Sequence, residues 1–191
     1  WTSPPSTQGY LTLSTLKGFE MINNKDEYLH ALIESYRIFA SDRDNITFDY
    51  KGNDKNFLGT NDEYIRDKVG LFDEQAAGKY NFPNPHGGGT AYMNVVDDNG
   101  LGISLIQSNF YGIGSRIGVG NYGFFLHNRG CGFNLIKSHP NCLGPNKKPL
   151  HTLSPTIWSK NGSLDFITGT RGGRYQPQLL AQTILPYILG E

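Results

Sequence analysis

Residues 87–108 read GGGTAYMNVVDDNGLGISLIQS, and this stretch carries the strongest signal for the fold. Two segments of strand-like composition, Tyr92 to Asp97 and Leu101 to Phe110, flank Asp98-Asn99-Gly100. An Asn-Gly pair between two such segments is typical of a tight hairpin turn, because both residues tolerate positive φ. The sequence therefore predicts an antiparallel hairpin that begins just after three consecutive glycines.

Other local patterns surround this hairpin. Asn161-Gly162-Ser163 separates residues 154–160 from residues 164–168 and predicts a second hairpin. Apolar residues at intervals of three and four predict helices, and a polar, glycine-broken stretch predicts a loop. The expected helices are 9–21, 26–42, 63–72 (capped by Asn61-Asp62) and 178–189 (after Pro177), and the expected loop is 43–60. Helices, then strands, then a helix predict an α+β fold rather than alternating βαβ units.

Composition excludes several classes of function. The 191 residues include 17 Lys+Arg and 17 Asp+Glu, so the chain lacks the basic footprint of a nucleic-acid or membrane-surface protein. Its longest apolar runs are far shorter than the roughly 20 residues of a spanning helix. Two cysteines, Cys131 and Cys142, are too few for a disulfide framework. No secretory signal is visible, and cytoplasmic and secreted or periplasmic locations both stay open.

Thr90 is the candidate nucleophile. A threonine hydroxyl attacks poorly unless a base takes its proton, and an N-terminal amine with a pKa of about 7.7 to 8.0 can be that base. This chemistry requires a cut between Gly89 and Thr90. The preceding glycines permit a strained junction, at which the Thr90 hydroxyl attacks the Gly89 carbonyl. Taken alone, a glycine-rich turn entering a strand explains the same residues.

Several further motifs occur in a fixed order along the chain. They are Pro4-Pro5-Ser6-Thr7, Ser41-Asp42-Arg43, Val95-Val96-Asp97-Asp98-Asn99-Gly100, Gly112-Ile113-Gly114-Ser115, Pro145-Asn146-Lys147-Lys148-Pro149-Leu150, Ser154-Pro155-Thr156-Ile157 and Gly169-Thr170-Arg171-Gly172-Gly173. With Thr90, these motifs resemble the γ-glutamyltranspeptidase family of N-terminal-nucleophile hydrolases. The resemblance implies that the chain forms part of a four-layer αββα sandwich.

The resemblance also implies a zymogen that cleaves itself. Thr90 matches the nucleophile, and Gly89-Thr90 matches the cleavage junction. Residues 1–89 correspond to the C-terminal part of the large subunit, including the tether before the cut, and residues 90–191 to the first part of the small, catalytic subunit. Together they would form one incomplete domain, because family members continue upstream, where they carry a substrate-binding arginine, and downstream.

Three more positions match residues that assist the nucleophile. Ser108 matches a family threonine whose hydroxyl orients the nucleophile, and Gly172 and Gly173 match the pair whose N–H groups form the oxyanion hole. Without the resemblance, Ser108 would be a strand serine facing solvent. The two glycines would then form only a tight turn.

The substrate-binding positions depart from the transpeptidase pattern. An asparagine, a glutamine and an aspartate of the family fall on Phe110, Arg129 and Gly132, so the acidic partner for a substrate ammonium group is lost. Paired family serines fall on His151 and Thr152, which leaves one hydroxyl. We expect Arg129 and Thr152 to bind a substrate carboxylate, although a surface arginine is the other interpretation of Arg129.

These departures resemble the branch that includes cephalosporin-acylase-type enzymes. The chain shares with it Asn128-Arg129-Gly130, His139-Pro140-Asn141 and Gln176-Pro177-Gln178. The segment between Phe133 and Pro145 is too short for the lid loop of typical transpeptidases. Because an open pocket admits water, we expect hydrolysis to be favoured over transfer.

The resulting prediction is a self-processing threonine amidohydrolase or acyltransferase related to γ-glutamyltransferases of glutathione metabolism. It would cleave γ-glutamyl or related carboxyl-bearing acyl amides without a metal or organic cofactor. Its partners would be a small-molecule amide substrate and the remainder of its own two subunits, with a homodimer of heterodimers left open. Two alternatives remain: a catalytically silent member of the fold, and a non-catalytic module that binds another ligand or holds zinc through His127, Cys131, His139 and Cys142.

Overall fold

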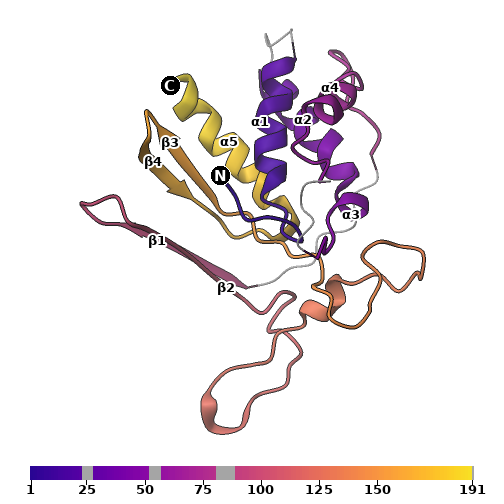
Figure 1. Cartoon of the computed structure of the whole chain (residues 1–191), viewed down its shortest axis with the longest axis vertical. Coiled ribbons are helices and arrows are strands. Elements are labelled where there is room, and N and C mark those ends of the chain that lie inside the picture. Colours follow the sequence, from indigo (N-terminus) through magenta and orange to yellow (C-terminus); the bar gives the residue numbers. More distant parts are fainter. Residues whose placement is uncertain (23–27, 52–56, 81–88, 191) are drawn as a thin grey trace.

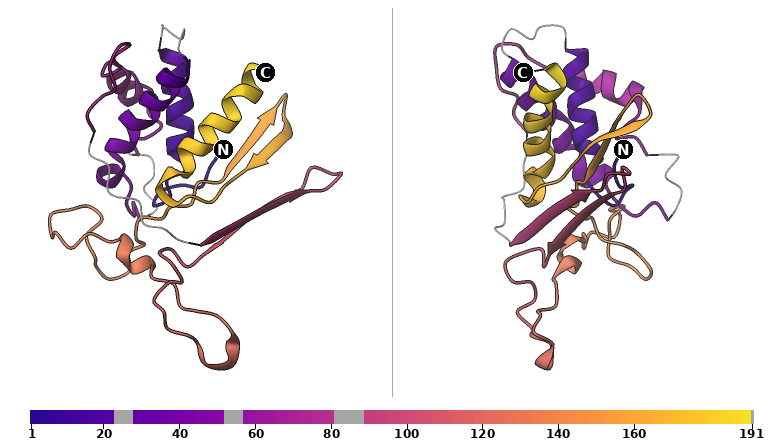
Figure 2. Two further views of the ribbon diagram at one scale, coloured as in Figure 1. Left: turned by 180° about the vertical axis from the view of Figure 1, so that it is seen from behind. Right: turned by 90° about the vertical axis from the view of Figure 1, so that its left-hand side faces the viewer.

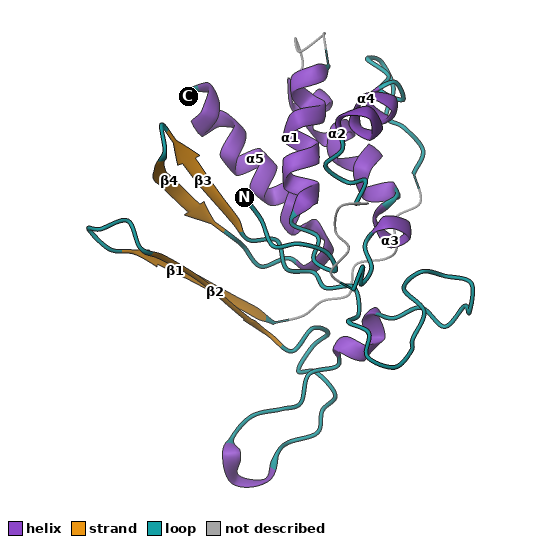
Figure 3. Ribbon diagram, viewed as in Figure 1, coloured by secondary structure: helices purple, strands orange, loops and turns teal. Residues whose placement is uncertain are grey.

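The computed structural model describes residues 1–22, 28–51, 57–80 and 89–190. The helices lie together on one side, and two β-hairpins lie beside and below them (Figure 1; Figure 3). The segment between the two hairpins extends away from this body as long loops (Figure 2). This mixture of segregated helices and strands confirms the α+β prediction.

The helices largely follow the sequence pattern. The structure contains α1 (Tyr10–Met21), α2 (Tyr28–Ser41), α3 (Arg43–Ile46), α4 (Asp62–Val69) and α5 (Gln176–Leu189). The predicted cap of α4 is confirmed, since the Asn61 side-chain oxygen accepts hydrogen bonds from two N–H groups of the first turn. Helix α5 begins two residues earlier than predicted, because Pro177 fits the first turn, where its missing N–H has no helical partner.

The prediction of a continuous loop over residues 43–60 was wrong at its start. Helix α3 forms there around Arg43, which is buried although it is charged. Its guanidinium hydrogen-bonds to the side chains of Asp44 and Gln8. These contacts explain a helical turn that the local sequence pattern does not predict.

The hydrophobic core joins helices that lie on both sides of the predicted cleavage junction. One buried cluster combines residues of α1 and α2 and the adjoining Ile22 with residues of α5: Phe19, Ile22, Ala31, Leu32, Ala181 and Leu185. A second cluster joins α1, α2 and α4 through Tyr10, Leu11, Phe39 and Ile65. Burial of this apolar surface holds α5 against the helices that precede Thr90.

Both predicted hairpins are confirmed. Strand β1 (Thr90–Val96) pairs antiparallel with β2 (Gly102–Ser108), and β3 (Thr156–Lys160) pairs antiparallel with β4 (Ser163–Thr168). Asn161 and Gly162 have φ of 53° and 83°, as the turn between β3 and β4 requires. The register of the first hairpin places Thr90 directly opposite Ser108.

The N-terminal segment runs beside the chain that enters β3. Thr2 pairs with Thr156, and Thr7 pairs with His151. The N–H of His151 donates to the carbonyl of Ser6 at 2.8 Å, and the N–H of Gln8 donates to the carbonyl of Leu153 at 3.0 Å. Residues 151–153 are therefore held in an extended conformation next to the site described below.

One face of the first hairpin is apolar and exposed. Met93 and Val95 of β1 lie opposite Leu105 and Ile103 of β2, and all four side chains are at least 49 % exposed. The other face carries Thr90 and Ser108. Among the described residues, no helix combines the length and apolar composition needed to cross a membrane.

Candidate active site

A cavity of about 120 Å³ lies where the first hairpin meets the segment that enters β3. Its wall consists of Thr90, Ile106, Ser108, Arg129, His151, Thr152, Leu153 and Gln176. The structure thus brings together Thr90, Ser108, Arg129 and Thr152, which the sequence analysis singled out from separate motifs.

The hydroxyl of Thr90 is oriented by its cross-strand neighbour. It donates a hydrogen bond to Oγ of Ser108 at 3.0 Å, and the N–H of Phe110 donates to the same oxygen at 3.1 Å. Ser108 faces the cavity, so its interpretation as a solvent-facing strand serine is wrong. The two hydroxyls meet because the hairpin register places Thr90 and Ser108 on one face.

Arg129 is buried, so its interpretation as a surface arginine is also wrong. Its Nη1 donates to the Thr152 hydroxyl at 3.1 Å, and its guanidinium lies 4.6 Å from the centre of the Phe110 ring. Burial lowers the pKa of this guanidinium from its usual value. Within the described part of the chain, no carboxylate forms an ion pair with Arg129. A buried cation in this state is suited to bind an anionic group.

His151 is a neutral hydrogen-bond donor at this wall. The N–H of Leu153 donates to its Nδ1 at 3.1 Å, so the proton of the neutral ring resides on Nε2. Burial, together with the nearby Arg129 and His127, lowers the pKa of His151 to about 4. The sequence identifies His151 only as the replacement of a family serine, because the hydrogen bond that sets its tautomer depends on the backbone conformation.

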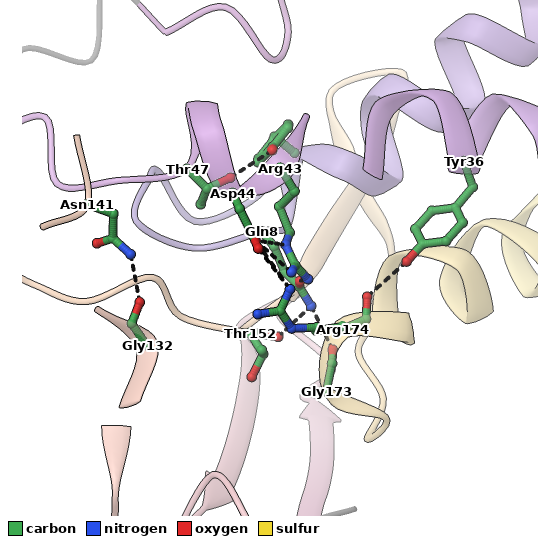
Figure 4. A network of polar contacts seen from close by, with 11 residues as sticks. Gln8, Tyr36, Arg43, Asp44, Thr47, Gly132, Asn141, Thr152, Gly173 and Arg174 are labelled. Atoms are coloured by element: carbon green, nitrogen blue, oxygen red, sulfur yellow. Dashed lines mark hydrogen bonds and ion pairs between the residues drawn. The ribbon is translucent and has the colours of Figure 1, made fainter. Parts of the chain in front are cut away.

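Gly172 and Gly173 do not line the cavity but lie beside it. They have φ of 129° and 55°, conformations that favour glycine, and a short turn over Gly173–Tyr175 leads from them into α5 at Gln176. The side chain of Gln8 connects this turn to the cavity wall, since its Nε2 donates to the carbonyls of Thr152 at 3.0 Å and Gly173 at 2.7 Å (Figure 4). The predicted oxyanion-hole role of the two glycines stays a prediction.

A buried polar network holds Gln8 in place (Figure 4). Arg43 donates to Oε1 of Gln8 at 3.3 Å and to the Asp44 carboxylate, and Arg174 donates to the same carboxylate at 3.1 Å. The sequence alone does not predict a role for Gln8, because nothing near it in the chain distinguishes it from a surface glutamine. Its role depends on contacts with residues more than 140 positions away.

The junction before Thr90 is partly described. Gly89 is exposed, and no neighbouring atom lies within 4 Å of the position that a Cβ would occupy. Gly87 and Gly88, on which the strained-junction prediction also depends, lie outside the described residues. Strain at the junction therefore stays a prediction.

The zinc alternative has no geometric support in the described part of the chain. No group of three or more His, Cys, Asp or Glu side chains gathers there in a way that could hold a metal ion. Cys131 and Cys142 are both free thiols, and Cys131 is exposed. The ligand set of this alternative, His127, Cys131, His139 and Cys142, is therefore not assembled.

Comparison with known proteins agrees with the motifs. The family model described as Gamma-glutamyltranspeptidase matches residues 1–190. Over 93% of its own length, this chain is 33% identical to the glutathione hydrolase-like YwrD proenzyme of Bacillus subtilis. Over 99% of its own length, it is 30% identical to the oxamate amidohydrolase proenzyme of Klebsiella pneumoniae. The crystal structure of cephalosporin acylase from Bacillus halodurans superposes on the whole chain with a TM-score of 0.84 at 28% identity.

The chain corresponds to about a third of each of these proteins. It covers 35% of the Bacillus subtilis protein, 37% of the Klebsiella pneumoniae protein and 35% of the acylase chain.

Proposed function

Because this chain belongs to the γ-glutamyltranspeptidase family, we propose that it is part of a proenzyme that cuts itself before Thr90 and becomes a threonine amidohydrolase. One observation carries the proposal: the Thr90 hydroxyl donates to Ser108 in a cavity whose wall also holds the buried Arg129. A nucleophile and a cation without a carboxylate partner among the described residues suit the attack on an amide whose acyl group is anionic.

The proposed reaction has two stages. The free amine of Thr90, directly or through one water, takes the hydroxyl proton while Oγ attacks the amide carbonyl. The N–H groups of Gly172 and Gly173 stabilise the oxyanion, and the amine product leaves with the proton. Water then attacks the resulting ester, releases the carboxylic acid and restores the Thr90 hydroxyl. An amine acceptor in place of water gives transfer, which we propose to be the slower outcome.

The proposed substrate is a γ-glutamyl or related acyl amide with a free carboxylate. Arg129 and the Thr152 hydroxyl lie 3.1 Å apart and can bind the two oxygens of one carboxylate. The names of the similar proteins, a glutathione hydrolase-like protein and an oxamate amidohydrolase, both denote amides of acids that carry a further carboxylate. This agreement supports a carboxyl-bearing acyl group over a neutral one.

Intact-mass measurement of the full-length protein and two variants tests the nucleophile. We expect the wild type to give two masses that divide before Thr90, Thr90→Ala to give one uncut mass, and Thr90→Ser to retain cutting and turnover in part. Chromogenic γ-glutamyl, glutaryl and butyryl anilides then test the acyl group, with the butyryl compound as the neutral control.

Two results would contradict the proposal. A Thr90→Ala protein that still divides at this junction would remove Thr90 from the cutting reaction. A fully cut wild type that turns over none of the three anilides would instead favour a catalytically silent member of the family.

A further inference from the structure

The buried cation Arg129 has an aromatic ring as its electrostatic partner. Within the described part of the chain, its guanidinium makes one side-chain hydrogen bond, to the Thr152 hydroxyl, and no ion pair. The guanidinium carbon lies over the Phe110 ring, 4.6 Å from its centre, which is within the range of an attractive cation–π contact. Phe110 is also buried, so water screens this contact only weakly.

An aromatic partner differs from a carboxylate in what it leaves free. An arginine that is paired with a carboxylate gives N–H groups to that partner. The face of an aromatic ring instead attracts the positive charge through its quadrupole and leaves the N–H groups to other acceptors. Arg129 lines both the cavity at Thr90 and a second cavity of about 600 Å³, which gives an occupant access to this side chain.

Hydrogen bonds fasten the backbone around Phe110 to the segment that carries Arg129. The side chain of Asn128 accepts from the N–H of Tyr111 at 3.0 Å and donates to the carbonyl of the same residue at 3.3 Å. The N–H of Asn128 donates to the carbonyl of Asn109 at 3.2 Å. Because Asn128 directly precedes Arg129, these bonds hold the ring and the guanidinium in the same region.

Phe110 also has an uncommon backbone conformation. Its φ is 78°, in the left-handed region that bulky side chains rarely adopt. In this conformation its N–H donates to Oγ of Ser108, the oxygen that accepts the Thr90 hydrogen bond. Backbone strain of this kind persists only where surrounding contacts impose it, and it is frequent at functional sites.

We infer that Phe110 is a positioning residue whose ring holds the Arg129 cation ready for the carboxylate of the substrate. This inference rests on the proposed function. The backbone N–H of Phe110 supports Ser108 for every substrate, whereas the ring matters only for substrates that carry the carboxylate. The transpeptidase pattern has an asparagine at this position, so the ring belongs to this chain and not to that pattern.

Two substrates that differ in the carboxylate test the inference. Phe110→Leu removes the ring and keeps the backbone N–H, and kcat and KM of the full-length protein are measured for glutaryl and butyryl p-nitroanilide. We expect KM for the glutaryl compound to rise about tenfold, because the cation loses its partner. Its kcat, and both constants for the butyryl compound, should change little, since a contact made equally in the ground and transition states affects KM alone. Phe110→Tyr keeps an aromatic face and should have a KM near the wild-type value.

Trifluorophenylalanine at position 110 separates the charge of the ring from its shape. The ring stays close to its original size, but the fluorine atoms withdraw negative charge from its face, and we expect KM for the glutaryl compound to rise several-fold. This variant decides if Phe110→Leu does not mature, which intact-mass measurement shows. Phe166→Leu is the matched control, since Phe166 is also a stacked ring, on Trp158, and lines neither cavity. It should leave both KM values unchanged.

Other outcomes overturn the inference and leave the proposed function standing. Equal changes on the two substrates in Phe110→Leu would show that Phe110 supports only the fold or the nucleophile. An unchanged KM for the glutaryl compound with trifluorophenylalanine would show that the charge of the ring face does not hold Arg129, whatever the leucine variant does. Failure of the proposed function looks different, because the cut wild type would then turn over neither compound.

Discussion

At the scale of single residues, Arg129 is a buried cation at the candidate active site. Its guanidinium lies over the ring of Phe110 and bonds to a neutral hydroxyl, and it has no carboxylate partner in the described chain. Replacing a buried charge with an apolar side chain of similar length is often neutral or stabilising for the fold. Stability and function should therefore respond in opposite ways when this residue is changed.

Arg129→Met is expected to lower kcat/KM for the glutaryl anilide by about 100-fold, because the substrate carboxylate loses its charged partner. Turnover of the butyryl anilide should change little, and the thermal unfolding temperature should stay the same or rise. Arg66→Met, at an exposed position of α4, is the control. Equal losses on both anilides would show that Arg129 does not bind the carboxylate.

The lowered pKa of His151 makes the stability of the protein depend on pH. Its pKa is about 4 in the folded chain and about 6.5 in an unfolded one. Between these values the unfolded chain binds a proton that the folded chain does not, so stability falls as pH decreases from about 6.5 to 4. The ring is half-buried, and solvent screening limits the effect to about 1 kcal/mol.

Denaturant unfolding at pH 7 and pH 5 measures this contribution. In His151→Asn, the fall in the free energy of unfolding from pH 7 to pH 5 should be smaller than in the wild type, by up to about 1 kcal/mol. Arg129→Met should also reduce the loss, since it removes a neighbouring positive charge that lowers the pKa of His151. If His151→Asn shows the same pH dependence of stability as the wild type, the lowered pKa of His151 is not its cause.

At the scale of elements, the N-terminal segment is what positions the site. It pairs along the residues that enter β3, and Gln8 then joins Thr152 to the turn of Gly173 at the start of α5. Three stretches that are distant in sequence meet at one amide group (Figure 4). A change at Gln8 should therefore affect both stability and catalysis.

Gln8→Leu is expected to destabilise the fold by about 2 to 3 kcal/mol, because the carbonyls of Thr152 and Gly173 lose the amide that joins them and the buried Arg43 loses one of its acceptors. It should also lower kcat, since Thr152 and the turn at Gly173 are no longer held together. Unfolding free energies and steady-state rates measure the two effects, with the exposed Gln75→Leu as control. A Gln8→Leu protein with wild-type stability would contradict this account of the network.

At the scale of the whole molecule, the core spans the proposed cut. Ala181 and Leu185 of α5 pack against α1 and α2, which precede Thr90 in the chain. The N-terminal segment adds backbone pairing across the same junction. Cutting before Thr90 removes one covalent link but none of these contacts.

The two pieces of the mature protein should therefore stay together in size-exclusion chromatography and separate only under denaturing conditions. Leu185→Ala should weaken their association by about 2 to 5 kcal/mol, because it leaves a cavity in the shared core. Leu189→Ala, on the exposed end of α5, should have little effect. Mature wild-type pieces that separate in native buffer would show that the core does not hold them.

Local patterns in the sequence determined most of the secondary structure. The Asn-Gly turn signals and the helical spacing of apolar residues predicted both hairpins and the principal helices, because turn geometry and amphipathic faces depend on near neighbours. The pairing of Thr90 with Ser108 follows from the first hairpin. The local sequence pattern does not predict helix α3, since Arg43 is held by a hydrogen bond to Gln8 in the distant N-terminal segment.

Only the tertiary structure decided which polar groups are buried and which of them lack a partner. Arg129 and Gln176 are ordinary polar residues in the sequence, and their chemistry depends on the segments that surround them. Gln8 acquires its role from carbonyl groups that the folded backbone brings to it. Burial and long-range hydrogen bonding depend on how distant segments pack, and a local sequence pattern carries no information about that packing.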